Sequence, residues 1–234
     1  MNAIELLPFV VRRANSDEDF VALSALRAAA YARHDYLPGV SERLRSIDET
    51  DLRSTLLVAE SKADGEIIGT IRVNSSLRGA TPIPEQMPKV EFEGDSFTYV
   101  DRFAAQQGPL ADIVALAMIK AQWFCAYQEG VQWIVAAALP ALARRYRMVG
   151  LRSLAGAERG RFQIPHLHTK PYEAVGERLP GMPGNLRRVA PFLAPFFLEK
   201  DHPDILFDKP ALLAEHIAAG TTGADPAEAR ALVA

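Results

Sequence analysis

Thr70-Ile-Arg-Val-Asn74 and Tyr99-Val-Asp-Arg-Phe-Ala-Ala105 are two short strand-like runs, and each carries one arginine among mostly apolar residues. The first run closes a hairpin signal, because Thr55–Glu60 and Glu66–Val73 contain β-branched residues and flank an Asp-Gly turn. An arginine in such surroundings needs an anion nearby. Arg72 is therefore either an arginine at a sheet edge that is paired with a carboxylate, or part of a site that binds a charged ligand.

Length and composition set broad limits on the class of protein. At 234 residues the chain is long enough to bury a large core in one domain, with or without an appendage. The net charge of −3 gives no sign of a nucleic-acid partner or of an acidic substrate. The single cysteine cannot form an internal disulfide, and no stretch reaches the roughly 18 apolar residues of a membrane span. We expect a cytoplasmic protein without a transmembrane segment.

The hydrophobic periodicity predicts an α/β (α+β) fold in which helices flank a mixed central sheet. Ser16 and Asp19 resemble a capping box, and Gly130 and Gly150 end two helices. Gly69 interrupts the third strand and indicates a bulge or a close backbone approach. The expected strands cover 8–13, 55–60, 66–73, 97–105, 131–137 and 151–154, and the expected helices cover 16–33, 109–129 and 140–150.

The last quarter of the chain differs in character from the rest. Residues 1–171 carry the strands and helices of one expected domain, whereas residues 172–234 form a Pro- and Phe-rich helical extension. Its segment 186–197 repeats apolar residues at helical spacing, and short helices are expected at 209–219 and 225–233. An exposed stripe of phenylalanines would be a liability. The extension should therefore pack on the domain, cover an apolar slot, or form a homodimer contact.

Polar residues at two further places are candidates for a site. Phe20, Leu23, Arg27 and Tyr31 follow one another at spacings of three, four and four residues, so all four lie on one face of the first helix. A core-facing arginine is costly unless it is paired or lies beside a ligand cavity. Asp48 and Asp51 are three residues apart and could share a face, although a solvated loop is the simpler interpretation of that segment.

Two of these patterns resemble a known superfamily. Tyr146-Arg-Met-Val-Gly150-Leu151 is similar to the Tyr-x-x-x-Gly-aromatic ending of the fourth helix in GNAT acyltransferases, with leucine in place of the aromatic residue. Within that superfamily, residues 8–155 resemble the acyl-homoserine lactone synthases and the N-acyl amino acid synthases. The matching positions are Arg27 with Tyr31, Asp48 with Asp51, Arg72, and Arg102. The acid that this family places three residues before the last arginine is Tyr99 here, and Asp101 directly precedes Arg102.

This resemblance implies a GNAT-like, mostly antiparallel sheet and a function. The chain would be an N-acyltransferase that moves a fatty acyl group from a thioester to the amine of an amino acid or a similar small molecule. The catalytic candidates are Tyr99, Asp101, Arg102 and Tyr146. Tyr146 stands where the family often keeps the acid that protonates the leaving thiolate, and it could equally be a packing tyrosine. The substrate-binding candidates are Arg27, Tyr31, Asp48, Asp51, Arg72 and Phe103.

The donor can be argued from the segment Gln106-Gln-Gly-Pro-Leu-Ala-Asp112. Acetyl-CoA-using members of the superfamily hold the pyrophosphate there on backbone amides. This chain offers Gln107 and Gly108 as donor contacts, but Pro109 has no N–H and Asp112 is negative. We therefore expect no tightly bound cofactor and a phosphopantetheine thioester as co-substrate, on acyl carrier protein rather than on CoA. Arginines that could meet an acidic carrier protein, or simply complement a helix dipole, are Arg144, Arg145, Arg147 and Arg152.

Other residues admit structural interpretations as well as functional ones. An acyl slot could be lined by Phe103, Met118, Trp123 and Trp133, which core packing explains equally well. Cys125 is expected to be a core thiol, and His166 with His168 lacks the further ligands of a metal site. Two alternatives to the synthase remain open at this point. One is a catalytically silent GNAT-like module that binds an acyl ligand or a protein, and the other is a conventional acyl-CoA N-acyltransferase.

Overall fold

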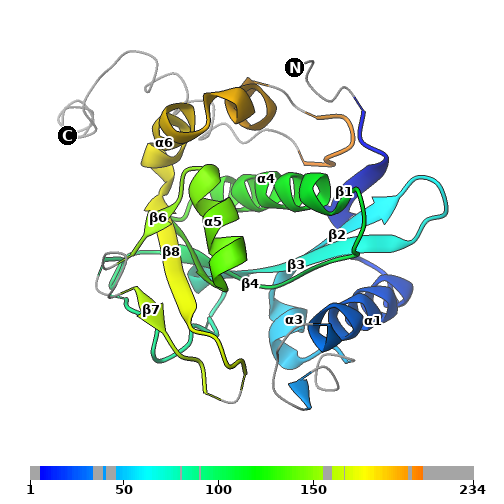
Figure 1. Ribbon diagram of the computed structural model, residues 1–234, viewed down its shortest axis with the longest axis horizontal. Helices are drawn as coiled ribbons and strands as arrows, with labels where there is room; N and C mark the ends of the chain where they lie inside the picture. Colours follow the sequence, from blue (N-terminus) through cyan, green and yellow to red (C-terminus); the bar gives the residue numbers. More distant parts are fainter. Residues whose placement is uncertain are drawn as a thin grey trace.

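The computed structural model describes residues 6–33, 39–40, 46–79, 81–89, 91–154, 160–165, 167–199 and 202–207. One eight-stranded sheet forms its centre, in the order β1-β2-β3-β4-β5-β8-β6, with β7 paired to β8 (Figure 1). The strands are β1 (Phe9–Arg13), β2 (Thr55–Ser61), β3 (Ile67–Ser75), β4 (Phe97–Ala105), β5 (Trp133–Ala138), β6 (Arg152–Ser153), β7 (Arg161–Phe162) and β8 (Tyr172–Arg178).

Every pair of neighbouring strands in this sheet is antiparallel except β4 with β5. The α/β class and the mostly antiparallel sheet are therefore confirmed. The helices are α1 (Asp17–Ala32), α3 (Glu49–Arg53), α4 (Ala111–Glu129), α5 (Pro140–Met148) and α6 (Met182–Val189), and short helical turns cover Ser76–Arg78, Leu179–Gly181, Pro191–Leu193 and Pro195–Glu199.

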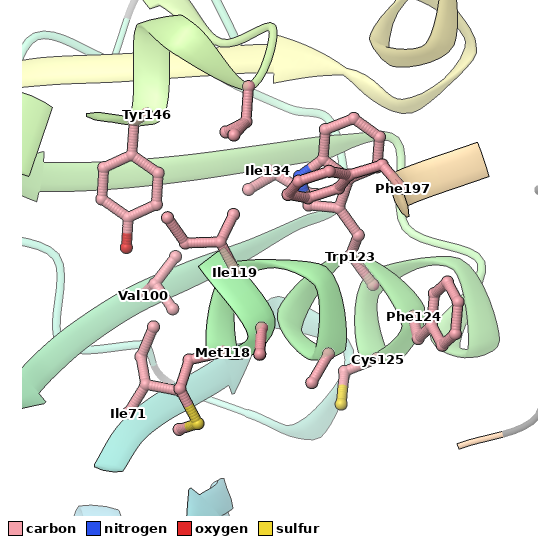
Figure 2. Close-up of a cluster of buried hydrophobic side chains, with 14 of the residues drawn as sticks. Ile71, Val100, Met118, Ile119, Trp123, Phe124, Cys125, Ile134, Tyr146 and Phe197 are labelled. Atoms are coloured by element: carbon pink, nitrogen blue, oxygen red, sulfur yellow. The ribbon is translucent and has the colours of Figure 1, made fainter. Parts of the chain in front are cut away.

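Two layers of helices cover the sheet (Figure 1). α1 and α3 lie on one face, and α4 lies on the other with α5 and α6. Because α4 is apolar nearly all round, it is buried over most of its length. Figure 2 shows the cluster that α4 forms with the sheet and α5, with Met118, Ile119 and Trp123 at its centre. None of the helices in the described part of the chain combines the length and the hydropathy that a bilayer crossing needs.

Two glycines have positions that only glycine fits. Gly69 lies at a register shift between β2 and β3, and a Cβ there would stand 2.5 Å from Val114 Cγ1 of α4. The expected bulge and close approach are thus both present. Gly150 follows α5 with φ of +99°, a region that side chains rarely adopt, and its Cβ would press on the backbone of Leu186 at 3.1 Å. The Tyr-x-x-x-Gly pattern therefore ends in glycine for a steric reason.

The C-terminal region needs one correction. The sequence placed residues 172–178 in the extension, but they form β8, which lies between β5 and β6 inside the sheet. Six consecutive residues of β8 are buried, but its sequence Tyr-Glu-Ala-Val-Gly-Glu-Arg contains two glutamates and a glycine and therefore lacks the apolar run that marks a buried strand. Beyond β8 the phenylalanine stripe packs on the domain, since the Phe197 ring lies 5.1 Å from that of Trp123, while Phe192 is exposed. The expected helices at 209–219 and 225–233 lie outside the described residues.

Candidate active site

Strands β4 and β5 run side by side and then separate. Their ladder joins Phe97–Val100 to Trp133–Ala136 and ends there, although β4 continues to Ala105 and β5 to Ala138. Backbone groups of β4 beyond Val100 consequently have no partner in β5. A gap of this kind presents N–H and C=O groups in the middle of a sheet, where a ligand can bond to them.

On its other edge β4 carries a bulge. The register with β3 shifts between Thr70 and Arg72, so that Arg102 and Phe103 stand opposite a single residue of β3. Among the non-glycine residues that the structure describes, Arg102 alone has a positive φ, +50°. This conformation costs on the order of 1–2 kcal/mol, and surrounding contacts must hold it. The strained residue therefore lies in the bulge against β3, two residues after the ladder with β5 ends.

A cavity of about 1180 Å³ opens at the gap between β4 and β5. Part of its wall is charged and is formed by Arg72, Asp101 and Arg102. The apolar part of the wall includes Pro82, Pro84, Leu139, Leu142, Ile164 and Leu167. The catalytic, substrate-binding and donor-binding candidates that line the cavity are Tyr31, Arg72, Tyr99, Asp101, Arg102, Phe103, Gln107 and Tyr146, and Arg145 lines it as well. A cavity with a charged and an apolar wall suits an amphipathic substrate.

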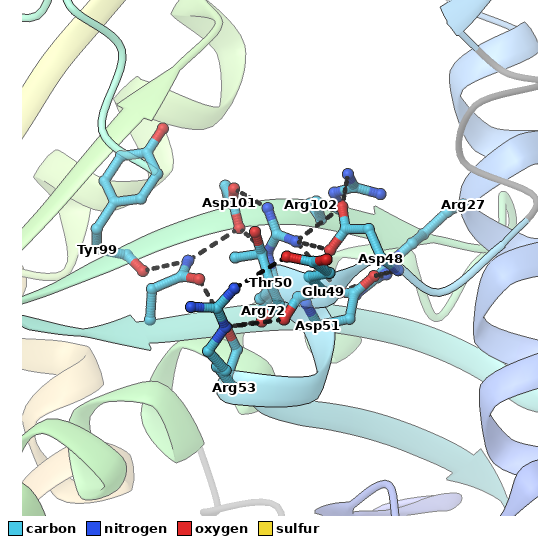
Figure 3. A network of polar contacts seen from close by, with 12 residues as sticks. Arg27, Asp48, Glu49, Thr50, Asp51, Arg53, Arg72, Tyr99, Asp101 and Arg102 are labelled. Atoms are coloured by element: carbon cyan, nitrogen blue, oxygen red, sulfur yellow. Dashed lines mark hydrogen bonds and ion pairs between the residues drawn. The ribbon is translucent and has the colours of Figure 1, made fainter. Parts of the chain in front are cut away.

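Arg72 stands at the centre of the charged wall (Figure 3). Its Nε and Nη2 donate to Oδ1 and Oδ2 of Asp101 at 2.7 and 2.6 Å, in a bidentate pair. Its Nη1 donates to Asp48 Oδ1 at 3.1 Å and to Asp51 Oδ1 at 3.3 Å. Burial opposes the charge, but Asp101, Asp51 and Asp48 outweigh it and raise the pKa of Arg72. Every nitrogen of this guanidinium is thus used within the protein.

The short helix α3 turns two carboxylates toward the arginines. Asp48 is its N-cap and accepts from Asp51 N–H at 2.8 Å, while Asp51 Oδ2 accepts from Asp48 N–H at 3.2 Å. Asp51 is fully buried and pairs with Arg27 Nη1 at 3.0 Å, and Arg102 Nη2 donates to Asp48 Oδ2 at 2.5 Å. The interpretation of this segment as a solvated loop is therefore wrong. Arg27, Asp48 and Asp51 support the cavity wall without lining it.

The cluster leaves some donors unused. Burial opposes ionisation of Asp48, but the Asp51 N–H and the charges of Arg102 and Arg72 hold its pKa below the usual value. Burial lowers the pKa of Arg27, whose Nε and Nη2 lack a hydrogen-bond partner among the described residues. Arg102 Nη1 is likewise buried with no acceptor in that part of the chain. Asp48 is hence an ionised acceptor at neutral pH, and Arg102 retains a donor for an anion.

Tyr99 and Tyr146 line the cavity outside the charged cluster. Figure 3 shows the Tyr99 ring turned away from the network, which uses only its carbonyl. Tyr146 is buried against α4 and lies beside Ile119 and Val100 (Figure 2). Burial raises the pKa of both phenols above the usual value. Both therefore stay protonated at neutral pH, so they can donate a proton or a hydrogen bond but cannot act as bases.

Sequence reasoning missed Asn74, which organises the cluster. Its Nδ2 donates to Tyr99 O at 3.0 Å and to Asp101 Oδ1 at 3.2 Å, and its Oδ1 accepts from Ser54 Oγ at 2.7 Å. Asn74 thus joins the end of α3 to β3 and helps to fix Asp101. Asparagine is disfavoured inside strands, and that was the available signal in the sequence.

The loop between β4 and α4 forms part of the cavity wall. Gln107 lines the cavity, and Gly108 beside it has φ of +143°. α4 then begins at Ala111, and no side chain caps its N-terminus. Donor binding by Gln107 and Gly108 stays a prediction.

Most of the arginines expected to meet a carrier protein are paired within the chain. Arg144 is exposed, and no ion pair of its own is found among the described residues. The other three form the pairs Arg145 with Asp112, Arg147 with Glu173, and Arg152 with Glu91. Contact with a carrier protein therefore remains a prediction that rests mainly on Arg144.

Several other candidates belong to the core. Met118, Trp123 and Trp133 are buried away from the cavity, so that of the expected slot residues only Phe103 lines it. Cys125 is a core thiol whose pKa burial raises to about 12. His168 is buried, its Nδ1 accepts from Lys170 N–H at 2.7 Å, and it also lines the cavity, whereas His166 lies outside the described residues. No group of side chains suited to a metal ion occurs in the described ranges.

Comparison with solved structures supports the same fold. FeeM, an N-acyl amino acid synthase from uncultured soil microbes, aligns with a TM-score of 0.60 at 18% identity, over 80% of this chain and 97% of FeeM. The acyl-homoserine lactone synthase LasI aligns with a TM-score of 0.50 at 16% identity, over 78% and 95%. An acetyltransferase from Corynebacterium glutamicum related to histone acetyltransferase HPA2 gives 0.52 at 18% identity, over 73% and 96%. These likenesses establish a GNAT fold.

Sequence comparison identifies the family. A search of curated proteins finds no match. The family model described as N-acyl amino acid synthase FeeM matches residues 22–168, which include every site residue discussed above. An N-acyltransferase is therefore favoured over a silent binding module. The chain belongs to the FeeM family of N-acyl amino acid synthases.

Proposed function

We propose that this N-acyltransferase moves a fatty acyl group from the phosphopantetheine arm of acyl carrier protein to the amine of an amino acid. The observation that carries the proposal is the single cavity in which the Arg–Asp cluster meets an apolar wall. The apolar wall takes the acyl chain, because burial of each methylene contributes about 0.8 kcal/mol. The charged wall takes the zwitterionic acceptor, and the thioester lies between them against β4.

Arg102 is the residue best suited to hold the acceptor's carboxylate. Arg72 cannot do so without breaking its bonds to Asp101, Asp48 and Asp51. Arg102 uses one nitrogen for Asp48 and retains Nη1, which has no acceptor in the described chain. A charge-assisted bond to a carboxylate would satisfy that donor. Asp48, which has a lowered pKa, holds Arg102 from behind the wall, and Asp101, which does line the cavity, is placed to bind the ammonium group.

The reaction needs three further groups. The ammonium group first releases one proton to solvent. The free amine nitrogen then bonds to the thioester carbon, the carbonyl becomes an oxyanion, and the carbon–sulfur bond breaks as the amide forms. Asp101 lines the cavity and accepts the proton that leaves the amine, directly or through water. N–H groups of β4 beyond Val100, which β5 does not use, donate to the oxyanion. Tyr146 holds its proton at neutral pH and gives it to the departing thiolate.

The remaining candidates have supporting roles in this proposal. Arg72 positions Asp101 through the bidentate pair, and Arg27 with Asp51 fixes α3 under the cluster. Tyr31 and Phe103 line the cavity, where they limit the space for the acceptor and the acyl chain. We assign Tyr99 the role of a neutral hydrogen-bond donor in the cavity. Burial raises the pKa of its phenol, so it cannot act as a base in place of the acid that the family has in its fourth strand.

The test is transfer by the purified protein from a long-chain acyl carrier protein to a panel of amino acids, with the product identified by mass spectrometry. Each accepted amino acid is compared with its carboxamide, which lacks the carboxylate. Arg102→Ala should raise KM for the amino acid by about 10- to 100-fold, the worth of a charge-assisted hydrogen bond, with a smaller effect on the carboxamide.

Arg53→Ala is the matched control, because within the part of the chain that the structure describes Arg53 pairs only with Glu49, on the exposed face of α3. This variant should keep the wild-type preference for the amino acid over its carboxamide. Equal losses for both acceptors in Arg102→Ala would remove the carboxylate assignment. Absence of any N-acyl product from the folded wild-type protein would overturn the proposed reaction.

A further inference from the structure

An ion pair borders the cavity at the start of α4. Asp112, in the first turn of α4, contacts Arg145 of α5, and Arg145 lines the cavity together with Ala111 and Gln107. Asp112 is 84% exposed, so its carboxylate faces solvent beside this part of the cavity wall. A thioester donor whose arm leaves the cavity past Gln107 and Ala111 would bring whatever follows its pantetheine group to this pair.

The two donors of a phosphopantetheine thioester differ at this point. Acyl-CoA carries a diphosphate and a further phosphate, whereas a carrier protein joins the arm through one phosphodiester. A free Arg145 would attract the diphosphate, and so would the partial positive charge at the start of α4. Asp112 occupies Arg145 and places a negative charge over that first turn. Pro109, three residues earlier, removes one backbone N–H that could also have held phosphate.

On the basis of the proposed function, we propose that Asp112 is a specificity determinant for the donor. Through its pair with Arg145 it disfavours acyl-CoA and leaves the arm of a carrier protein as the accepted donor. An acid in the first turn of a helix also stabilises that helix, typically by 0.3–1 kcal/mol. That purely structural role would change the stability of a variant without changing its choice of donor, so the two roles are separable.

The experiment measures kcat/KM of Asp112→Asn with acyl-CoA and with acyl-pantetheine, which has the same thioester and no phosphate. The ratio of the two values should rise about fivefold over the wild-type ratio, the upper end of what one exposed charge pair contributes. Asp112→Asn combined with Arg145→Ala should lose most of that gain, because the released cation is gone. Asp17→Asn is the matched control, since Asp17 is an exposed acid in the first turn of α1.

The outcomes separate this inference from the function on which it rests. A donor ratio in Asp112→Asn equal to the wild-type ratio, or an equal rise in Asp17→Asn, would overturn the role of Asp112 while transfer from acyl carrier protein still stood. Failure of the wild-type protein with acyl carrier protein, acyl-CoA and acyl-pantetheine alike would overturn the proposed function instead. A wild-type preference for acyl-CoA over acyl carrier protein would overturn the donor inference directly.

Discussion

At the scale of the residue, Tyr146 has both a packing role and a proposed chemical role, and one substitution can distinguish them. Its ring belongs to the buried cluster around α4, while its side chain also reaches the cavity wall. Tyr146→Phe keeps the ring and removes only the hydroxyl. We expect the transfer rate to fall about 100-fold, as for the loss of a general acid, with little change in the thermal midpoint. Single-turnover kinetics and thermal unfolding measure the two quantities.

The pH and leaving-group dependence test the same assignment. Because burial raises the pKa of Tyr146, its proton is retained as pH rises, and the rate should show no loss from this group up to about pH 9. A donor with a more acidic thiol, such as an aryl thioester, needs less protonation. The defect of Tyr146→Phe should shrink with that donor. A defect of equal size with both donors would return Tyr146 to a packing role.

Residue identity in the site was only partly readable from the sequence. The apolar neighbours of Arg72 implied that it has an anionic partner. Three carboxylates from two elements bind it in the structure, and the order of residues along the chain does not show which acids these would be. The inward turn of Asp48 and Asp51 depends on a capping box built from two aspartates, a pattern that also suits a loop. Asn74 stands out in the sequence only as an unfavourable residue for a strand, and the residues that it joins are defined by contacts between distant segments.

At the scale of the element, the close contact of α4 with β3 rests on Gly69. A methyl group at Gly69 would stand 2.5 Å from Val114 Cγ1, and the β-branched Val114 has little rotamer freedom in a helix. Gly69→Ala should therefore lower the free energy of unfolding by about 1–3 kcal/mol, measured by urea denaturation. Adding Val114→Ala should recover part of the loss, because it removes the clashing atom. Strictly additive effects of the two substitutions would contradict this account.

Elements with local signals were predictable, and those set by distant contacts were not. β4 has the predicted bounds of 97–105, and α4 ends before Gly130, whose φ of +65° gives a left-handed cap. The strands β6 and β7 have two residues each and owe their existence to β8. The separation of β4 from β5 that opens the cavity is likewise a property of the packed sheet. No sequence pattern within either strand predicts this separation.

At the scale of the whole molecule, the described C-terminal segment closes the sheet next to β1. Val11 N–H donates to Asp204 O at 2.7 Å, and Leu206 N–H donates to Val11 O at 2.9 Å. The Asp204 side chain accepts from Leu7 N–H at 2.7 Å and pairs with Lys62 Nζ at 2.6 Å. Because β1 ends the sheet order, these bonds cover part of an edge that would otherwise be open to another chain.

The charge of Asp204 should therefore stabilise the whole fold without affecting the rate of acyl transfer. Burial opposes its ionisation, but Lys62 and the Leu7 N–H hold its pKa below the usual value. A lowered pKa gives stability that is present above about pH 4 and is lost as pH falls through the folded-state value. Asp204→Asn keeps an acceptor for Leu7, so at neutral pH it should lose only about 1–2 kcal/mol in urea unfolding. That deficit should close as pH falls below about 4, with kcat/KM for transfer preserved because Asp204 does not line the cavity. A deficit independent of pH would mean that shape, and not charge, fastens the chain end to β1.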